Sequence, residues 1–209
     1  AVVWYTGQFY ALFFLERTLR VDGATANIMI AIALAIGTPF FIVFGWLSDR
    51  IGRKKIILTG CLLAALTYFP LFHALTQAAN PALARAQANA PVTVLTLDAP
   101  CSVQFDPIGR TRFDERPCDV AKSYLAKAGV PYRQIEMNDA VPDWRGFVMV
   151  QVGEPTMVVP NPAGFPDAAM RKAAIEDFQS RLKSELEAAG YPERADPAEI
   201  DKPLTIAVL

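Results

Sequence analysis

Charged side chains are nearly absent from much of the first part of this 209-residue chain. Residues 24–47 contain none, and the ionisable side chains of residues 56–79 are one cysteine, one tyrosine and one histidine. Residues 1–79 hold six Lys and Arg against three Asp and Glu, whereas residues 80–209 hold fourteen against eighteen. This pattern excludes a soluble single-domain enzyme, a disordered chain and a basic nucleic-acid-binding protein. We therefore expect no nucleic-acid partner.

Cysteine and histidine are also scarce, at three residues and one residue. No CxxC pair is present, and neither a histidine nor a third cysteine lies near Cys101 and Cys118 in the sequence. Structural zinc requires four such ligands. We therefore expect neither a metal ion nor a cofactor.

The two uncharged runs are long enough to cross a membrane. As helices, residues 24–47 and 56–79 would each span about 36 Å, against a hydrocarbon core of about 30 Å. Residues 1–21 are predicted to form a further span that is cut at its start. No methionine opens the chain and no basic segment precedes its first apolar run, so nothing resembles a signal peptide. We expect a piece of a longer membrane protein.

Charge in the short loops predicts the orientation. The loop 48–55 carries Arg50, Arg53, Lys54 and Lys55 against Asp49, whereas the charges between the first two spans cancel. Basic loops favour the cytoplasmic side. The spans over about 1–21, 24–47 and 56–79 then place residues 80–202 outside the cytoplasm, where disulfides form.

A spaced motif surrounds this loop and reads Gly-x-x-x-Asp-Arg-x-Gly-Arg-Lys-Lys. Its fixed positions include Gly45, Asp49, Arg50, Gly52, Arg53 and Lys54. We expect the first glycine to permit close helix approach and the second to permit a tight turn. The spacing resembles the loop signature of the major facilitator superfamily, in which these residues bias conformational exchange.

The first span resembles the seventh span of the metabolite:proton symporter branch, through the run that begins Trp4-Tyr5-Thr6-Gly7-Gln8. This resemblance implies spans seven to nine of a twelve-span proton-coupled symporter in a bacterial inner membrane, and not an enzyme. Its implied partners are a proton, the lipid bilayer, the missing helices and a small organic acid, amino acid or osmolyte. Residues 80–202 then form a periplasmic insert.

Polar side chains in the first span are candidates for the substrate pathway. Tyr5 and Gln8 share a helical face, and Tyr10 lies on another face. An amide or phenol at membrane depth is expected to face a cavity or a neighbouring helix rather than lipid.

The second half is predicted to be a small α+β domain, so the fold class is mixed, with transmembrane helices followed by this domain. The predicted strands are 92–97, 132–137, 147–152 and 156–159, and the predicted helices are 119–128 and 167–189. Residues 203–209 are predicted to begin the next transmembrane helix, with a last strand as the alternative.

Cys101 and Cys118 enclose sixteen residues in the predicted oxidising half. A structural disulfide between them is the simplest interpretation, and such a loop would contribute about 3 kcal/mol of stability.

Two other functions remain open for this half. Residues 118–136 resemble the helix and second strand of glutaredoxins, but thiol exchange in that family uses a partner two residues away, whereas here the partner is seventeen residues upstream. A membrane-anchored binding or interaction domain is the other alternative.

Overall fold

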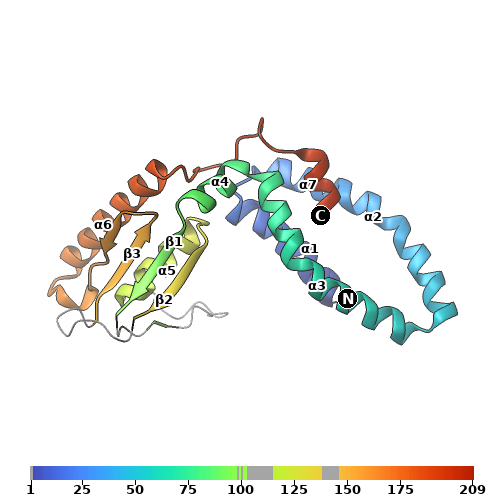
Figure 1. Ribbon diagram of the computed structural model, residues 1–209, viewed down its shortest axis with the longest axis horizontal. Helices are drawn as coiled ribbons and strands as arrows, with labels where there is room; N and C mark the ends of the chain where they lie inside the picture. Colours follow the sequence, from blue (N-terminus) through green and yellow to red (C-terminus); the bar gives the residue numbers. More distant parts are fainter. Residues whose placement is uncertain (1, 98, 100, 103–114, 138–145) are drawn as a thin grey trace. The chain divides into compact units, whose positions relative to one another are not determined.

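The computed structural model describes residues 2–97, 99, 101–102, 115–137 and 146–209, and for residues 2–6 it describes the backbone alone (Figure 1). The chain forms two compact units. The helical unit comprises Ala1–Ala84 and Glu193–Leu209, and the sheet unit comprises Arg85–Pro192.

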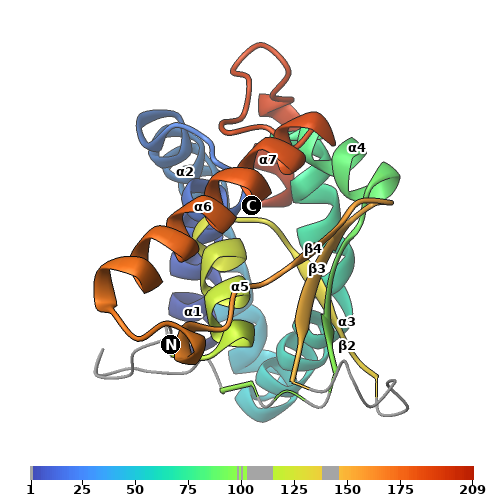
Figure 2. The same ribbon diagram turned by 90° about the vertical axis from the view of Figure 1, so that its left-hand side faces the viewer.

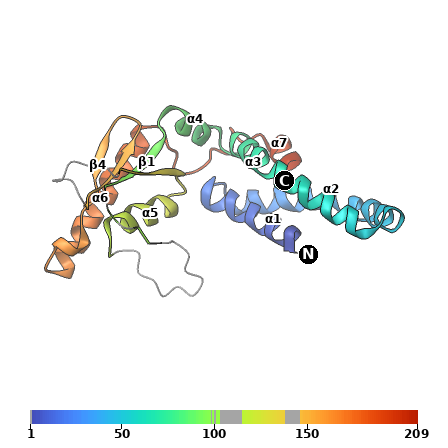
Figure 3. The same cartoon turned by 60° about the horizontal axis from the view of Figure 1, so that its bottom comes forward.

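The helical unit is built from four helices and one π-helical turn. These are α1 (Val2–Phe13) with its continuation η1 (Phe14–Thr18), α2 (Gly23–Ile51), α3 (Arg53–Ala79) and α7 (Lys202–Val208), together with the start of α4 (Pro81–Asn89). Helix α7 packs beside α2 and α3 (Figures 1 and 3). Of the described helices, α2 and α3 are long and apolar enough to cross a membrane.

Both long helices extend beyond the limits expected from hydropathy. The predicted loop 48–55 is almost entirely helical, because α2 continues to Ile51 and α3 begins at Arg53. Arg and Lys are good helix formers, so the charged residues prolong the helices instead of ending them. Gly52 alone separates α2 from α3.

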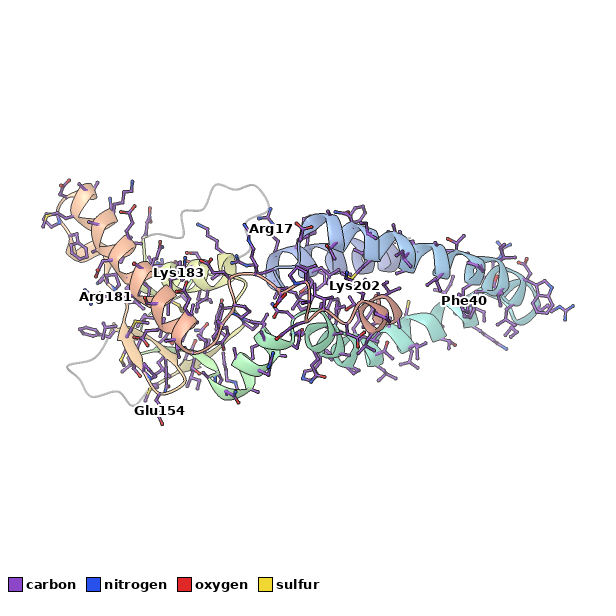
Figure 4. The ribbon with its side chains drawn as sticks, turned by 90° about the horizontal axis from the view of Figure 1, so that it is seen from above. Arg17, Phe40, Glu154, Arg181, Lys183 and Lys202 are labelled. Atoms are coloured by element: carbon purple, nitrogen blue, oxygen red, sulfur yellow. A yellow bond between two sulfur atoms is a disulfide. The ribbon has the colours of Figure 1, made fainter. Side chains whose placement is uncertain are left out.

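Large apolar side chains lie exposed along α2 and α3. Phe40 projects from α2 and is 55% exposed (Figure 4), and Phe69 on α3 is 87% exposed. Water is a poor solvent for such surfaces, whereas lipid or further apolar helices would cover them. The exposure supports a membrane location for this unit.

The buried core of the helical unit lies where η1, α2, α3 and α4 meet. Asn80 is 1% exposed, and its amide nitrogen donates to the Leu19 carbonyl at 2.9 Å. Its amide oxygen accepts from the Leu83 N–H at 2.9 Å and so caps α4. One side chain therefore satisfies backbone groups from two segments far apart in the sequence.

The segment after the sheet unit returns to the helical unit earlier than expected. The Ala195 N–H donates to the Arg20 carbonyl at 3.1 Å, and the Asp201 N–H donates to the Ala78 carbonyl at 2.9 Å. These backbone bonds attach residues 193–201 to the helical unit, whereas the sequence placed them in the insert. The following residues form α7, a helix rather than a last strand.

The sheet unit contains four strands and two packed helices. In chain order they are β1 (Val92–Thr96), α5 (Pro117–Lys127), β2 (Tyr132–Glu136), β3 (Val148–Val152), β4 (Thr156–Val158) and α6 (Ala168–Ala188). The predicted elements lie within one or two residues of these bounds. A short 3₁₀ turn, η3 (Pro162–Gly164), precedes α6.

The strand order is β2-β1-β3-β4. Strand β1 pairs in parallel with β2 and antiparallel with β3, so Val94 lies between Gln134 and Val150. Strands β3 and β4 form an antiparallel hairpin. The parallel pair requires a crossover, which α5 supplies.

One face of the sheet carries the core. Alternate residues of β1 and β3 are buried, and the buried positions face one another across the pair, as Val94 faces Val150. Figure 2 shows α5 and α6 on the same side of the sheet. Leu125 of α5 and Leu182 of α6 are both fully buried. This period-two burial is typical of a strand with one face against helices.

Tyr191 connects the end of α6 to the residues that precede β1. Its side chain is 5% exposed, and its hydroxyl donates to the Ala90 carbonyl at 2.8 Å. Loss of hydration on burial raises the pKa of Tyr191 to about 12.

Candidate functional site

The helical unit contains an open cavity of about 740 Å³. Helices α1, α2 and α3 line it, and the end of α7 completes the wall. Apolar residues dominate the lining, which is typical of small-molecule sites. The lining includes Gly7 and Gln8 of α1, Phe41 of α2, and Cys61, Tyr68 and Phe72 of α3.

Hydrogen-bonding side chains are few in this cavity. The Gln8 amide, the Tyr68 hydroxyl and the Cys61 thiol lie in the lining. No side chain of the described lining carries a charge. The described part of the cavity therefore offers neutral donors and acceptors in an apolar surround.

Helices α1 and α3 approach closely at Gly7. A β-carbon added at Gly7 would lie 3.3 Å from the hydroxyl oxygen of Tyr68. The absence of a side chain at Gly7 therefore leaves room for the Tyr68 hydroxyl against α1. Gln8 follows Gly7 in α1, and both Gln8 and Tyr68 line the cavity.

An aromatic cluster holds Phe72 in place. Its ring centroid lies 5.3 Å from that of Tyr10, 5.0 Å from that of Phe14 and 6.3 Å from that of Tyr68. All three pairs meet edge to face, which is a favourable geometry for aromatic rings. Because Phe72 also lines the cavity, the cluster gives that wall a rigid aromatic surface.

The pathway residues predicted from the sequence occupy different positions. Gln8 is half-buried and lines the cavity. Tyr10 packs against Phe14 and Phe72 and is not among the lining residues, so its place in the substrate pathway stays a prediction. The side chain of Tyr5 lies outside the described residues.

Sequence analysis missed Tyr68 and Phe72 as lining residues. Both lie in an uninterrupted apolar run of α3, where helical periodicity does not distinguish a cavity wall from a lipid-facing surface. The four-residue spacing of these two rings places them on one helix face, and that spacing was the available signal.

The predicted signature lies at a sharp corner between α2 and α3, at Gly52. Gly52 has φ 101° and ψ 129°, a conformation that a β-carbon disfavours. Arg53 pairs with Asp49 at 3.4 Å across the corner, and both side chains are exposed. The Arg50 guanidinium lies 4.1 Å from the centroid of the Trp46 ring. Such exposed pairs contribute little stability.

Two other members of the signature lie on either side of Gly52. A β-carbon added at Gly45 would meet nothing within 4 Å among the described residues, so the close helix approach expected at Gly45 stays a prediction. Lys54 lies in the first turn of α3 and is exposed.

The sheet unit contains a second site at the start of α5. Cys118 lies in the first turn of this helix, is fully buried, and forms a disulfide with the partly exposed Cys101. The Gln134 amide nitrogen donates to the Cys101 sulfur at 3.4 Å, and the Lys122 ammonium donates to the Gln134 amide oxygen at 3.2 Å. The disulfide therefore lies at the carboxyl end of β1, beside the parallel neighbour β2.

Asp119 orders the chain beside the disulfide. Its carboxylate is 1% exposed and accepts from the Ser102 N–H at 2.9 Å and from the Ser102 hydroxyl at 2.7 Å. An acidic side chain in the first turn also interacts favourably with the helix dipole. Among the described residues no three His, Cys, Asp or Glu side chains are grouped as metal ligands.

Comparison with known proteins identifies similarity in the helical part of the chain. The family model of the Major Facilitator Superfamily matches residues 1–90. A protein of Staphylococcus aureus (strain COL) named "Putative proline/betaine transporter" is 36% identical over 58 residues, which are 28% of this chain and 12% of that protein. A protein of the same name from Staphylococcus haemolyticus (strain JCSC1435) is 34% identical over 56 residues, which are 27% of this chain and 12% of that protein.

The chain therefore spans about one eighth of the length of the curated relatives that it matches. No solved structure matches it. The family match and the transporter-named relatives support a transporter of the major facilitator superfamily and point away from an enzyme. With the two long apolar helices, they indicate a membrane protein.

Proposed function

We propose that this chain is part of a proton-coupled symporter for a small organic acid, amino acid or osmolyte. The cavity that places Gln8 and Tyr68 in an apolar wall between α1 and α3 is the observation that carries this proposal. The names of the relatives mention proline and betaine, and both compounds belong to this substrate class. Uptake would be driven by the proton gradient in the complete transporter.

In this proposal η1 completes the span begun by α1, and α1, α2 and α3 are spans seven, eight and nine of twelve. Helix α7 begins span ten, and the remaining helices complete the cavity. The apolar faces of α2 and α3 support this assignment, because they need lipid or further helices to cover them. Gln8 would contact substrate, and the corner at Gly52 would contribute to conformational exchange.

The proposed location is a bacterial inner membrane with the corner between α2 and α3 in the cytoplasm. Four Lys and Arg against one Asp at this corner favour the cytoplasmic side. The sheet unit would then be periplasmic, and its disulfide is compatible with an oxidising compartment.

The transport proposal is tested by uptake in proteoliposomes that contain the complete transporter encoded by the reading frame of this chain. Radiolabelled amino acids, organic acids and osmolytes are supplied with and without an imposed proton gradient. Gradient-driven accumulation of one compound is expected. Accumulation that ignores the gradient would contradict proton coupling, and no accumulation of any compound would contradict the substrate class.

Gln8→Ala is expected to raise the half-saturating substrate concentration roughly tenfold, because it removes a hydrogen bond in a poorly hydrated site. Gln77→Ala is the matched control, since Gln77 lies exposed on α3 outside the cavity lining. Equal effects of the two substitutions would remove Gln8 from the substrate pathway.

The orientation is tested by labelling single cysteines in intact cells with a membrane-impermeant maleimide. Cys61 is replaced by serine, the Cys101–Cys118 disulfide is kept, and a cysteine is placed at Ala163 or Lys54. Both positions are exposed, so reactivity reports the side of the membrane. Labelling at position 163 alone is expected, and labelling at position 54 alone would invert the orientation.

A second candidate function is thiol–disulfide exchange by the sheet unit. The observation that favours it is the disulfide between the end of β1 and the first turn of α5, within a strand–helix–parallel strand unit. A thiolate of a dithiol reductant would attack the partly exposed Cys101 sulfur, and Cys118 would leave as a thiolate stabilised at the helix start. The second thiol of the reductant would then close its own disulfide and release Cys101.

Exchange is tested by the rate at which dithiothreitol reduces Cys101–Cys118, followed by mass tagging of the new thiols. If the disulfide takes part in exchange, dithiothreitol is expected to reduce it in the folded chain at least as fast as in the chain unfolded by urea. Reduction that requires unfolding would leave the disulfide with a structural role alone.

A further inference from the structure

We propose that Asp119 is a positioning residue for the Cys101–Cys118 disulfide. Its contact with Ser102 holds Cys101 beside Cys118 when the disulfide is reduced, so that the bond re-forms readily. The inference rests on the second candidate function, thiol–disulfide exchange, and names the residues that keep the two thiols together. The family match ends at residue 90 and does not cover them.

The contact joins the same two chain segments as the disulfide. Asp119 directly follows Cys118, and Ser102 directly follows Cys101. One carboxylate oxygen of Asp119 accepts from the Ser102 N–H at 2.9 Å, and the other accepts from the Ser102 hydroxyl at 2.7 Å. The segments are therefore joined twice, once through sulfur and once through hydrogen bonds that do not require the S–S bond.

Burial makes this contact costly to break. Asp119 is 1% exposed, so water has little access to its carboxylate if Ser102 moves away. Hydrogen bonds to a charged group are stronger than those between neutral groups, and a buried carboxylate that loses its donors is strongly disfavoured. Separation of the two segments would break both bonds, so the contact opposes separation after reduction.

The segment that carries Cys101 needs such a hold more than the segment that carries Cys118. Cys118 belongs to α5 and is fully buried. Cys101 and Ser102 are half-buried and belong to no helix or strand of the described residues. The Gln134 amide nitrogen donates to the Cys101 sulfur at 3.4 Å. Gln134 thus contacts the sulfur atom, whereas Asp119 fixes the backbone next to it.

Reduction by glutathione illustrates what this hold would change. The thiolate of one glutathione attacks the Cys101 sulfur, the S–S bond breaks, and Cys118 leaves as a thiolate. A second glutathione thiolate attacks the glutathione sulfur of this mixed disulfide, which releases the Cys101 thiolate and glutathione disulfide. In the reverse direction the Cys118 thiolate must meet the Cys101 sulfur of the mixed disulfide. A contact that keeps the two sulfurs close raises their effective concentration and favours closure.

The effective concentration of the two thiols is measured by equilibrating the complete chain in detergent with buffers of reduced and oxidised glutathione. After acid quenching and thiol tagging, mass spectrometry of the peptides that contain Cys101 and Cys118 gives the reduced fraction. The glutathione ratio at which half of the disulfide is reduced then gives the effective concentration.

Asp119→Ala is expected to lower the effective concentration roughly tenfold, and Ser102→Ala, which keeps the backbone bond, roughly threefold. Ser123→Ala is the matched control, because the Ser123 hydroxyl donates to the Val120 carbonyl within the same helix, and no change is expected. An unchanged effective concentration in Asp119→Ala, or an equal loss in Ser123→Ala, would overturn the inference.

The double variant Asp119→Ala/Ser102→Ala separates a joint role from two independent structural roles. If the two side chains act through their mutual bonds, the double variant loses no more than Asp119→Ala alone. Losses that multiply to roughly thirtyfold would overturn the inference, since independent sites have additive free energies.

Hydrogen exchange of the Ser102 amide tests the contact without a substitution. This N–H donates to Asp119, so we expect it to be protected both in the oxidised chain and in the chain reduced by dithiothreitol. Loss of protection on reduction would show that the contact does not outlast the disulfide and would overturn the inference.

The positioning role and the exchange function can fail independently. Reduction that requires unfolding, together with the expected losses of effective concentration, would contradict exchange and support the role of Asp119. Reduction in the folded chain with an unchanged effective concentration in Asp119→Ala would support exchange and overturn the role of Asp119.

Discussion

Removal of the Cys101–Cys118 disulfide is expected to destabilise the sheet unit by an amount that follows from its loop length. The two cysteines are 17 positions apart, and closure of a loop of this size contributes about 3 kcal/mol through the entropy of the unfolded chain. Cys101→Ser is the suitable change, because Cys101 is partly exposed whereas Cys118 is fully buried. The substitution therefore removes the cross-link without placing a new hydroxyl in the core.

The measurement is pulse proteolysis of the complete chain in detergent across a urea series, with cleavage sites mapped to Arg85–Pro192. Since unfolding of a small domain typically has a urea dependence of about 1–3 kcal/mol per molar, the midpoint should fall by about 1–3 M. Cys61→Ser is the control, because Cys61 is exposed in α3 and forms no disulfide. An unchanged midpoint in Cys101→Ser, or an equal fall in Cys61→Ser, would refute the entropic reasoning.

Three further predictions concern the corner, the tyrosine and the buried asparagine. Asp49→Asn or Arg50→Ala should slow transport in the complete transporter at unchanged equilibrium substrate affinity; unaltered rates at equal surface expression would remove the gating role. The raised pKa of Tyr191, about 12 against 10.0, means that its contribution to stability is complete below pH 10 and is lost as pH rises towards 12. Between pH 10 and pH 12 the urea midpoint of Tyr191→Phe should therefore fall less than the urea midpoint of the unaltered chain. Equal falls of the two midpoints would contradict the assignment of this pH dependence to Tyr191. Asn80→Ala should cost about 1–3 kcal/mol and lower the thermal midpoint, since it leaves buried backbone groups unsatisfied, whereas the exposed Gln77→Ala should not.

Local patterns were sufficient to predict most individual elements. The alternation of buried residues in β1 and β3 appears in the sequence as valines at alternate positions, and the turn residues Gly153-Glu154-Pro155 between β3 and β4 mark the hairpin. The start of α5 was less accurate, because Pro117 and Cys118 precede the first periodic residues and belong to the helix. Element ends depend on capping and on single backbone conformations, which hydrophobic periodicity does not report.

The candidate site was predictable only in part. Gln8 stood out because an amide within an apolar run needs a partner, whatever the neighbouring helices are. Phe72 and Tyr68 did not stand out, because the side chains of an apolar helix acquire different roles only when another helix packs against one of its faces. Tyr10 was a further candidate on another face of the first span, and the structure adds that its ring packs with Phe14 and Phe72.

The sequence by itself determined that the first part of the chain is built for a membrane, because uncharged runs of this length are stable there and costly in water. It also determined the order of strands and helices in the second part, since period-two and period-3.6 patterns are local properties. Only the tertiary structure decided that β1 pairs with both β2 and β3 and that residues 193–201 bond to the helical unit. It alone brought Gly7 against Tyr68, because contacts between residues distant in the chain depend on packing that no local pattern encodes.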